Sequence, residues 1–112
     1  MNELRARLVA YTAALNRFDM DAVEKMFAKD AVYASPGLAQ VMTGRNAIMS
    51  AFRVYFVKHA DQVNEDQDVR VLDARTIEAG WTLKSSRSQR SGKQRITYND
   101  AGEMIRVEVT DD

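Results

Sequence analysis

Apolar and polar side chains alternate along most of the second half of the chain, and this period of two constrains the fold more than any other feature. The alternation runs through four segments, residues 69–73, 77–84, 93–98 and 104–109. Successive side chains of a strand point to opposite faces, so each segment predicts a strand with one apolar face. The sequence Asn99-Asp100-Ala101-Gly102 predicts a turn between the last two segments. We therefore expect antiparallel strands joined by hairpins.

The first half of the chain has helical periodicity instead. An amphipathic helix is predicted from about residue 3 to residue 16, with an apolar stripe of Leu4, Leu8, Tyr11, Leu15 and Phe18. A short second helix follows, which either Asp19 or Asp21 can cap. A third helix is predicted over residues 45–58, with Thr43 as its cap and an inner stripe of Ile48, Phe52, Tyr55 and His59.

Two connecting segments complete the pattern. Residues 31–35 predict a short strand that ends at a turn formed by Pro36-Gly37. Residues 61–68 hold four acids and no base, which predicts a solvated loop. The order of helices, strand, helix and hairpins defines an α+β fold, with the helices packed on one face of a curved antiparallel sheet.

Composition limits the chain further. With 112 residues, of which 46% are hydrophobic and 29% charged, we expect one core and a single domain over residues 1–112. The formal net charge is zero, which argues against nucleic acid and anionic membranes as partners. The absence of cysteine excludes disulfides and thiol catalysis. The charged N-terminus leads directly into a helix pattern and lacks the apolar core of a signal peptide, so the predicted location is the cytoplasm.

Four stretches carry a resemblance to a known superfamily. They are Tyr11-Thr-Ala-Ala-Leu-Asn-Arg-Phe-Asp-Met-Asp-Ala-Val, Met26-Phe-Ala-Lys-Asp-Ala-Val-Tyr, Thr43-Gly-Arg-Asn-Ala-Ile and Ile96-Thr-Tyr-Asn-Asp-Ala-Gly-Glu-Met-Ile. In order and spacing they resemble the nuclear transport factor 2-like proteins, in the SnoaL-like and ketosteroid-isomerase-like branch. The resemblance implies a cystatin-like α+β cone, in which the sheet wraps around the first helix and leaves a cavity open at one end. This scaffold hosts isomerases, cyclases, dehydratases, binding modules and transport factors, so it does not fix a function.

The resemblance also implies site residues. Tyr11 is similar to the tyrosine that holds an oxyanion in the family's isomerases, and Gln94 falls at the position of the acid that assists it. Ser35, just before Pro36, falls at the position of the aspartate that moves the proton. A serine without a neighbouring base cannot shuttle a proton as a carboxylate does, and an amide donates more weakly than a protonated acid. These two departures argue against ketosteroid isomerisation.

Two other residues are candidates for the missing base. His59, the only histidine, lies on the inner stripe of the third helix, and an imidazole is suited to proton transfer at neutral pH. The alternative is a terminal helix residue stabilised by the helix dipole. Asp73 shares its parity with Val69 and Val71, which would place it in or beside a pocket if that face is inward. The alternative for Asp73 is a residue of a strand-end turn.

The segment 84–95 holds five bases and no acid, which permits an anion- or nucleic-acid-binding patch. The alternative, a charged sheet edge that resists aggregation, fits the zero net charge better. One histidine and no cysteine leave no metal constellation, and no cofactor motif is present. The resemblance implies a homodimer formed through the outer face of the sheet, although burying that charged face unpaired would cost several kcal/mol per ion, roughly.

Two functions stay open from the sequence. The first is a pocket protein that binds an apolar, ring-containing molecule and, if it is an enzyme, moves a proton next to a carbonyl in an isomerisation, cyclisation or dehydration. Tyr11 would hold the oxyanion, and His59 or Asp73 would be the base. The predicted ligand-binding residues are Phe18, Tyr33, Ser35, Phe52, Phe56, Trp81 and Gln94. The second is a non-catalytic interaction or dimerisation domain without a small-molecule substrate.

Overall fold

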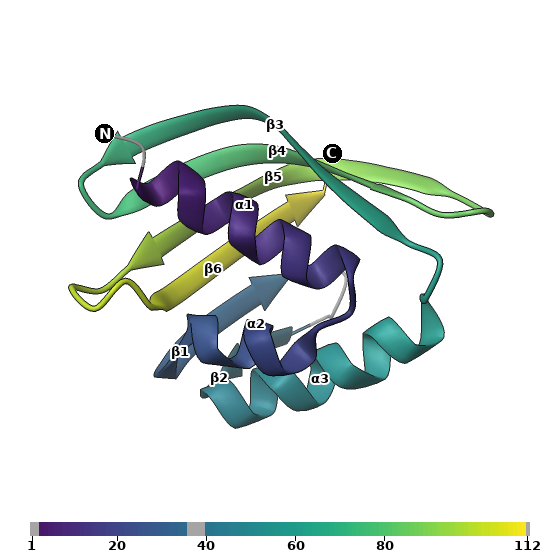
Figure 1. Ribbon diagram of the computed structural model, residues 1–112, viewed down its shortest axis with the longest axis horizontal. Helices are drawn as coiled ribbons and strands as arrows, with labels where there is room; N and C mark the ends of the chain where they lie inside the picture. The colour runs from purple at the N-terminus through teal and green to yellow at the C-terminus, as the bar shows by residue number, and fades with distance from the viewer. Residues whose placement is uncertain (1–2, 36–39, 112) are drawn as a thin grey trace.

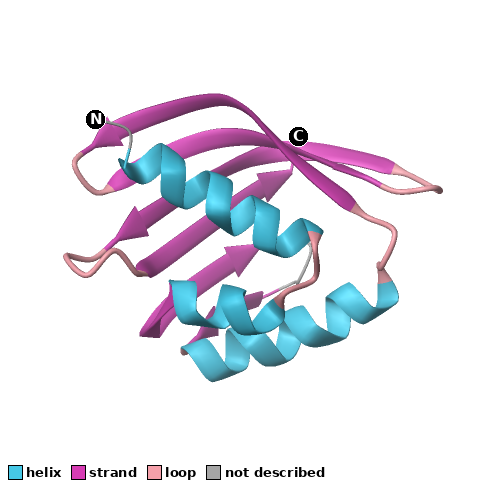
Figure 2. Cartoon of the chain, in the orientation of Figure 1, coloured by secondary structure: helices cyan, strands magenta, loops and turns pink. Residues whose placement is uncertain are grey.

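Three helices lie on one side of a six-stranded sheet in the computed structural model, which describes residues 3–35 and 40–111 (Figures 1 and 2). The helices are α1 (Glu3–Asn16), α2 (Met20–Met26) and α3 (Arg45–Lys58). The strands are β1 (Phe27–Ser35), β2 (Gln40–Thr43), β3 (Val63–Asp73), β4 (Thr76–Lys84), β5 (Gln89–Tyr98) and β6 (Met104–Asp111). The α+β prediction is confirmed. The turn predicted at Pro36-Gly37 lies outside the described residues.

The sheet has the strand order β2-β1-β6-β5-β4-β3. All neighbours are antiparallel except β1 and β6, which pair in parallel with Tyr33 opposite Val107. The expectation of a purely antiparallel sheet is therefore wrong at this one pairing. No hairpin links these two strands, because α3 and four other strands lie between them in the chain, so turn geometry does not fix their direction.

The helix ends follow local chemistry. Asp19 caps α2, because its Oδ1 accepts a hydrogen bond from the Ala22 N–H at 3.1 Å. The prediction that Thr43 caps α3 is wrong: Thr43 ends β2, where it pairs with Val32, and the N-cap is Gly44 without a side-chain cap. Gly44 has φ 97°, a conformation open to glycine at little cost.

The prediction of a solvated loop over residues 61–68 is wrong from Val63 onward, where β3 begins. This strand is the edge of the sheet, and α1 lies along it. Three hydrogen-bonded links join them: Arg5 donates to the Val69 carbonyl, Thr12 to Asp66, and Asn16 to the Asn64 carbonyl. Asn16 Oδ1 also accepts from the Asn64 N–H at 2.7 Å.

The spacing of these links explains why they form together. From residue 5 to residue 16 an α-helix rises about 16.5 Å. From residue 69 to residue 64 a strand advances about the same distance. Helix α1 and strand β3 therefore run in opposite directions, and the linked residues span the same length along each. As a result, α1 covers backbone groups that an open sheet edge would expose.

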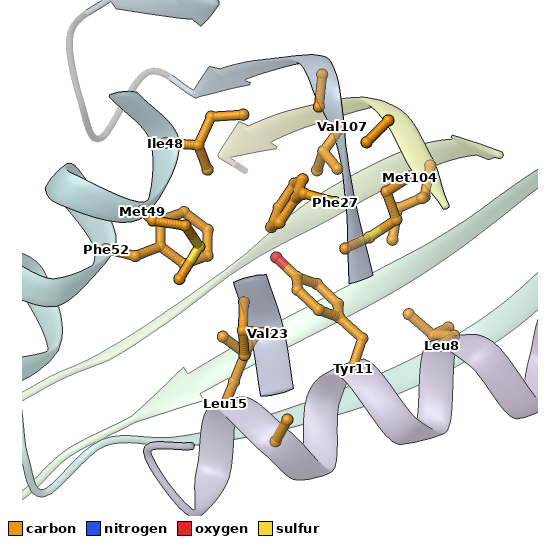
Figure 3. Close-up of a cluster of buried hydrophobic side chains, with 14 of the residues drawn as sticks. Leu8, Tyr11, Leu15, Val23, Phe27, Ile48, Met49, Phe52, Met104 and Val107 are labelled. Atoms are coloured by element: carbon orange, nitrogen blue, oxygen red, sulfur yellow. The ribbon is translucent and has the colours of Figure 1, made fainter. Parts of the chain in front are cut away.

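The core lies between the helices and the inner face of the sheet. Its largest fully buried side chains include Phe27, Leu8, Ile48 and Val107. Figure 3 shows Tyr11 extending from α1 into this cluster, and its ring meets Phe27 edge-on at 6.0 Å. The predicted helix stripes thus supply the core, as their spacing requires.

One strand differs from its predicted alternation. In β6, Met104 is buried and Ile105 is 37% exposed, the reverse of the expected parity. The register of β5 against β6 shifts between Thr97 and Tyr98. This irregularity reverses which side chains at the start of β6 face the core. Val107 returns to the inner face and is fully buried.

The outer face of the sheet carries charges that pair within the chain. Glu78 accepts from Arg70 and, at 3.0 Å, from Arg95, and Lys84 lies 2.9 Å from Glu65. The basic segment 84–95 is therefore partly neutralised by acids of neighbouring strands. None of the three described helices has the length and hydrophobicity needed to cross a bilayer.

Candidate functional site

A cavity of about 120 Å³ lies between α1, α3 and the inner face of the sheet. An apolar cavity of about 150 Å³ holds one benzene-sized ring, so this volume suits a single-ring molecule and not a steroid. Larger drug-binding pockets span roughly 300–1,000 Å³.

Aromatic side chains of α3 and β1 form one wall. The rings of Tyr33 and Phe52 meet edge-on at 5.1 Å, and Phe56 lies 5.9 Å from Phe52 and 5.3 Å from Tyr55. All four residues line the cavity. Edge-to-face packing holds these rings at fixed angles, so the wall is preorganised for a flat apolar ligand.

The inner end of the cavity is polar, and its centre is Asp66 on β3. Thr12 Oγ1 donates to Asp66 Oδ2 at 2.5 Å, and Gln94 Nε2 donates to Asp66 Oδ1 at 3.3 Å. Burial raises the pKa of Asp66 above its ordinary value, while the hydrogen bonds from Thr12 and Gln94 pull it down. A half-buried carboxyl group whose pKa is raised above its ordinary value is chemically suited to exchange a proton with a ligand.

Tyr11 lies beside this group. Its side chain is 3% exposed and lines the cavity, and its hydroxyl has no hydrogen-bond partner among the described residues. Burial raises the pKa of Tyr11 well above its ordinary value, and the charges of Tyr33, Tyr98 and Asp66 act in the same direction. Tyr11 therefore keeps its proton at neutral pH and can donate a hydrogen bond to an oxygen of a bound molecule.

Trp81 lies on the sheet side of the cavity, and its indole contacts Gly92 of the neighbouring strand. Asp66, Trp81, Gly92 and Asp111 are opposite one another in successive strand pairs, so their side-chain positions share the inner face. A Cβ on residue 92 would lie 2.7 Å from Trp81 Cζ2, so the indole packs directly against the Gly92 backbone.

The outer end of the cavity carries an ion pair. Arg90 of β5 and Asp111 of β6 both line it, and Arg90 Nη2 donates to Asp111 Oδ2 at 2.7 Å. Both side chains are partly exposed. The cavity therefore has two polar ends, with the Trp81 indole and the aromatic wall between them.

The structure brings most of the predicted site residues together. The cavity is lined by Tyr11, Tyr33, Ser35, Phe52, Phe56, Trp81 and Gln94. Phe18 does not line it: this residue is 39% exposed, has φ 58° between α1 and α2, and its ring lies 6.1 Å from the Phe56 ring.

The two predicted bases do not line this cavity. His59 ends α3, where its N–H donates to the Tyr55 carbonyl and its ring lies 4.4 Å from the Tyr55 ring. Asp73 lies at the far end of β3 and is exposed, and it accepts from the Arg75 N–H at 2.9 Å. That hydrogen bond and others lower the pKa of Asp73, which makes it a weaker base.

Sequence reasoning did not identify Asp66, Thr12, Arg90 and Asp111. A signal for the first two was present in α1, where Arg5, Thr12 and Asn16 recur at positions i, i+7 and i+11. A polar line beside the apolar stripe predicts that this side of the helix meets polar partners. No comparable pattern marks Arg90 or Asp111, which meet only through the pairing of β5 with β6.

The fold and the cavity define an α+β cone protein with a small, half-polar interior site. The chain matches the model of the SnoaL-like domain family over residues 8–111. It belongs to this family, and the predicted resemblance is confirmed. Among curated proteins no sequence matches the chain.

Several solved structures share the fold. A candidate ketosteroid isomerase from Kribbella flavida is 19% identical with a TM-score of 0.83, covering 96% of this chain and 76% of the other. A candidate polyketide cyclase from Sinorhizobium meliloti is 23% identical with a TM-score of 0.80, covering 93% of both chains. SalBIII, an epoxide hydrolase/cyclase-like enzyme in pyran ring formation, is 18% identical with a TM-score of 0.81, covering 100% and 95%. At these identities the similarity establishes the fold alone.

Proposed function

We propose that this protein binds a single-ring molecule bearing a carbonyl group in its interior cavity and moves a proton next to that carbonyl. The observation that carries the proposal is the half-buried Asp66, hydrogen-bonded by Thr12 and Gln94 beside the protonated hydroxyl of Tyr11. The aromatic wall supplies the apolar contact area for the ring.

The roles follow from the chemistry of each group. The Asp66 carboxylate takes a proton from the carbon next to the carbonyl, and the electron pair of that C–H bond moves onto the carbonyl oxygen. Tyr11 donates a hydrogen bond to the resulting enolate oxygen. The same carboxyl group then returns the proton to carbon, which is the core of an isomerisation and the first step of a dehydration or cyclisation.

Proton exchange tests this proposal without knowledge of the natural product. Cyclohexanone in D₂O should lose its α-proton NMR signals faster in the presence of the protein. Asp66→Asn should abolish the acceleration, whereas Asp73→Asn and His59→Gln, which change groups outside the cavity, should retain it. Exchange that survives Asp66→Asn would overturn the role of Asp66.

Binding has an independent readout. Trp81 is the only tryptophan of the chain and lines the cavity, so its fluorescence reports on occupancy. A ligand at about a hundred times its dissociation constant should also add roughly 2.7 kcal/mol to the free energy of unfolding. Cyclohexanone that changes neither signal would contradict the proposal. Homodimer formation and a cytoplasmic location stay predictions from the sequence.

A further inference from the structure

We infer that the ligand of this cavity is a carboxylic acid, whose carboxylate is bound by Arg90 at the outer end while its carbonyl lies at Asp66 and Tyr11. This inference rests on the proposed function and narrows its substrate class. It starts from the one cationic side chain among the described cavity-lining residues.

The Arg90 side chain lines the same cavity as the Asp66 carboxyl group. Arg90, Gly92 and Gln94 alternate along β5, so all three face the inner side of the sheet. Gln94 holds Asp66 at one end, Gly92 supports the Trp81 indole in the middle, and Arg90 lies at the other end. Residues 90 and 94 are about 13 Å apart along a strand. Two side chains reaching in from these ends leave room for one ring between them.

The guanidinium group is only partly used. Its hydrogen bond to a described residue runs from Nη2 to Asp111 Oδ2, which leaves Nε and Nη1 for a further acceptor. Guanidinium groups match carboxylates with two parallel N–H donors, so a ligand carboxylate suits this position better than a neutral group.

The ion pair with Asp111 does not prevent Arg90 from binding a ligand carboxylate. The pair with Arg90 is partly exposed, with side-chain exposures of 43% and 36%, and pairs of this kind contribute about 0–1 kcal/mol. Asp111 ends the described part of β6 and can turn into water when a ligand carboxylate takes its place. The ligand carboxylate would lie deeper beside the Trp81 indole, where a charge-assisted hydrogen bond is stronger.

The two ends of the cavity differ in charge, with Arg90 at the outer end and Asp66 at the inner end. Among the described residues that line the cavity, Asp66 is the other acid, and it lies at the inner end with Thr12 and Gln94 as donors. A single-ring keto acid can therefore place its carboxylate near Arg90 and keep it several ångströms from Asp66. A cationic ligand would instead have to compete with Arg90 for the outer end.

Three ligands of one ring size test the inference by calorimetric titration: cyclohexanone, 4-oxocyclohexanecarboxylate and 4-oxocyclohexanecarboxamide. We expect the carboxylate to bind about tenfold more tightly than the isosteric amide. Arg90→Gln should abolish that preference. Asp111→Asn should strengthen carboxylate binding, because Arg90 then has no competing carboxylate.

Lys93→Gln is the matched control, because it removes the same charge from the same strand at an exposed position on the opposite face. It should leave all three affinities unchanged. Cyclohexanone binding with equal affinities for the acid and the amide would overturn this inference and leave the proposed function intact. A carboxylate preference that persists in Arg90→Gln would also overturn it. Absence of cyclohexanone binding and exchange would overturn the proposed function itself.

Discussion

The indole of Trp81 packs against the backbone of Gly92, its partner across β4 and β5. A Cβ on residue 92 would meet Trp81 Cζ2 at 2.7 Å and the Thr110 carbonyl oxygen at 1.9 Å. The absence of a side chain at residue 92 therefore lets the indole, which lines the cavity, lie close to the backbone of β5.

Gly92→Ala should consequently strain the sheet. The Thr110 carbonyl belongs to the backbone of β6 and cannot move freely, so we expect a loss of about 1–3 kcal/mol in the free energy of unfolding. Urea denaturation measures this, and the Trp81 emission should shift in the folded state. Gly80→Ala is the control, since its Cβ would meet the flexible Gln67 side chain at 3.1 Å. Equal stability of the two variants would contradict the packing described here.

Tyr11→Phe should separate binding from stability. The Tyr11 hydroxyl has no described partner, so its removal should change the free energy of unfolding by less than about 1 kcal/mol. Cyclohexanone affinity should fall about tenfold, because the ligand oxygen loses its donor. Fluorescence titration and thermal unfolding measure the two quantities.

Tyr98→Phe provides the comparison for this prediction. The Tyr98 hydroxyl is buried without a partner among the described residues, burial raises its pKa to about 12, and Tyr98 does not line the cavity. Its removal should leave ligand affinity unchanged and raise stability, because an unsatisfied buried hydroxyl is costly. A loss of affinity in both variants would point to a general effect on the core.

Asp66→Asn should change the pH dependence of stability. Because burial raises the pKa of Asp66 above its ordinary 3.8, the folded state binds the proton more tightly than the unfolded state. The contribution of Asp66 to the free energy of unfolding is therefore largest below its ordinary pKa of 3.8, and it falls as pH rises through the folded-state pKa. Asp66→Asn lacks this loss, so its stability relative to the wild type should increase with pH. Urea denaturation between about pH 3 and 7 measures the difference.

Asp73→Asn should give the opposite slope. Hydrogen bonds from Arg75 and Thr76 lower the pKa of Asp73, so this carboxylate stabilises the fold above its ordinary 3.8, and the contribution is lost as pH falls through the lower folded-state value. The wild type should therefore lose its advantage over Asp73→Asn in acid. Slopes of the same sign in both variants would contradict the placement of Asp66.

Asn16→Ala should loosen the edge strand. Its side chain both donates to the Asn64 carbonyl and accepts from the Asn64 N–H, so its loss leaves two backbone groups of β3 without these partners. We expect a cost of about 1–3 kcal/mol. Hydrogen exchange should accelerate in β3 before it does in β5. Asn46→Ala, an exposed substitution on α3, should leave both measurements unchanged.

Much of the fold was predictable because its signals are local. Residues 3–16 and 45–58 became helices as predicted, since the apolar spacing of each stripe specifies a buried face. The aromatic wall followed from the same spacing, because residues 52 and 56 lie one turn apart and face the cavity together.

The features of the fold that the sequence did not predict depend on contacts between distant segments. Residues 69–73 of β3 were predicted as a strand, but residues 63–68 were not, because the period of two is broken by a register shift between Gln67 and Arg70, where Asp68 has φ 52°. Its stability as an edge strand comes from α1, some fifty residues earlier in the chain. The acidic composition of residues 61–68 predicts a solvated Asp66, although the fold places this residue in the cavity. The parallel pairing of β1 with β6 is equally remote in sequence.

The parallel pairing of β1 with β6 also affects how the polypeptide folds on the ribosome. β6 lies between β1 and β5, so it joins the half of the sheet beside α3 to the meander of β3, β4 and β5. Until residues 104–111 have left the exit tunnel, the two halves have no shared strand, and the apolar faces of both stay open to chaperones. Contacts of such long sequence separation slow folding, because the loop entropy is lost before the contacts form. Nascent chains arrested before Met104 should therefore remain protease-sensitive, and resistance should appear only when β6 emerges.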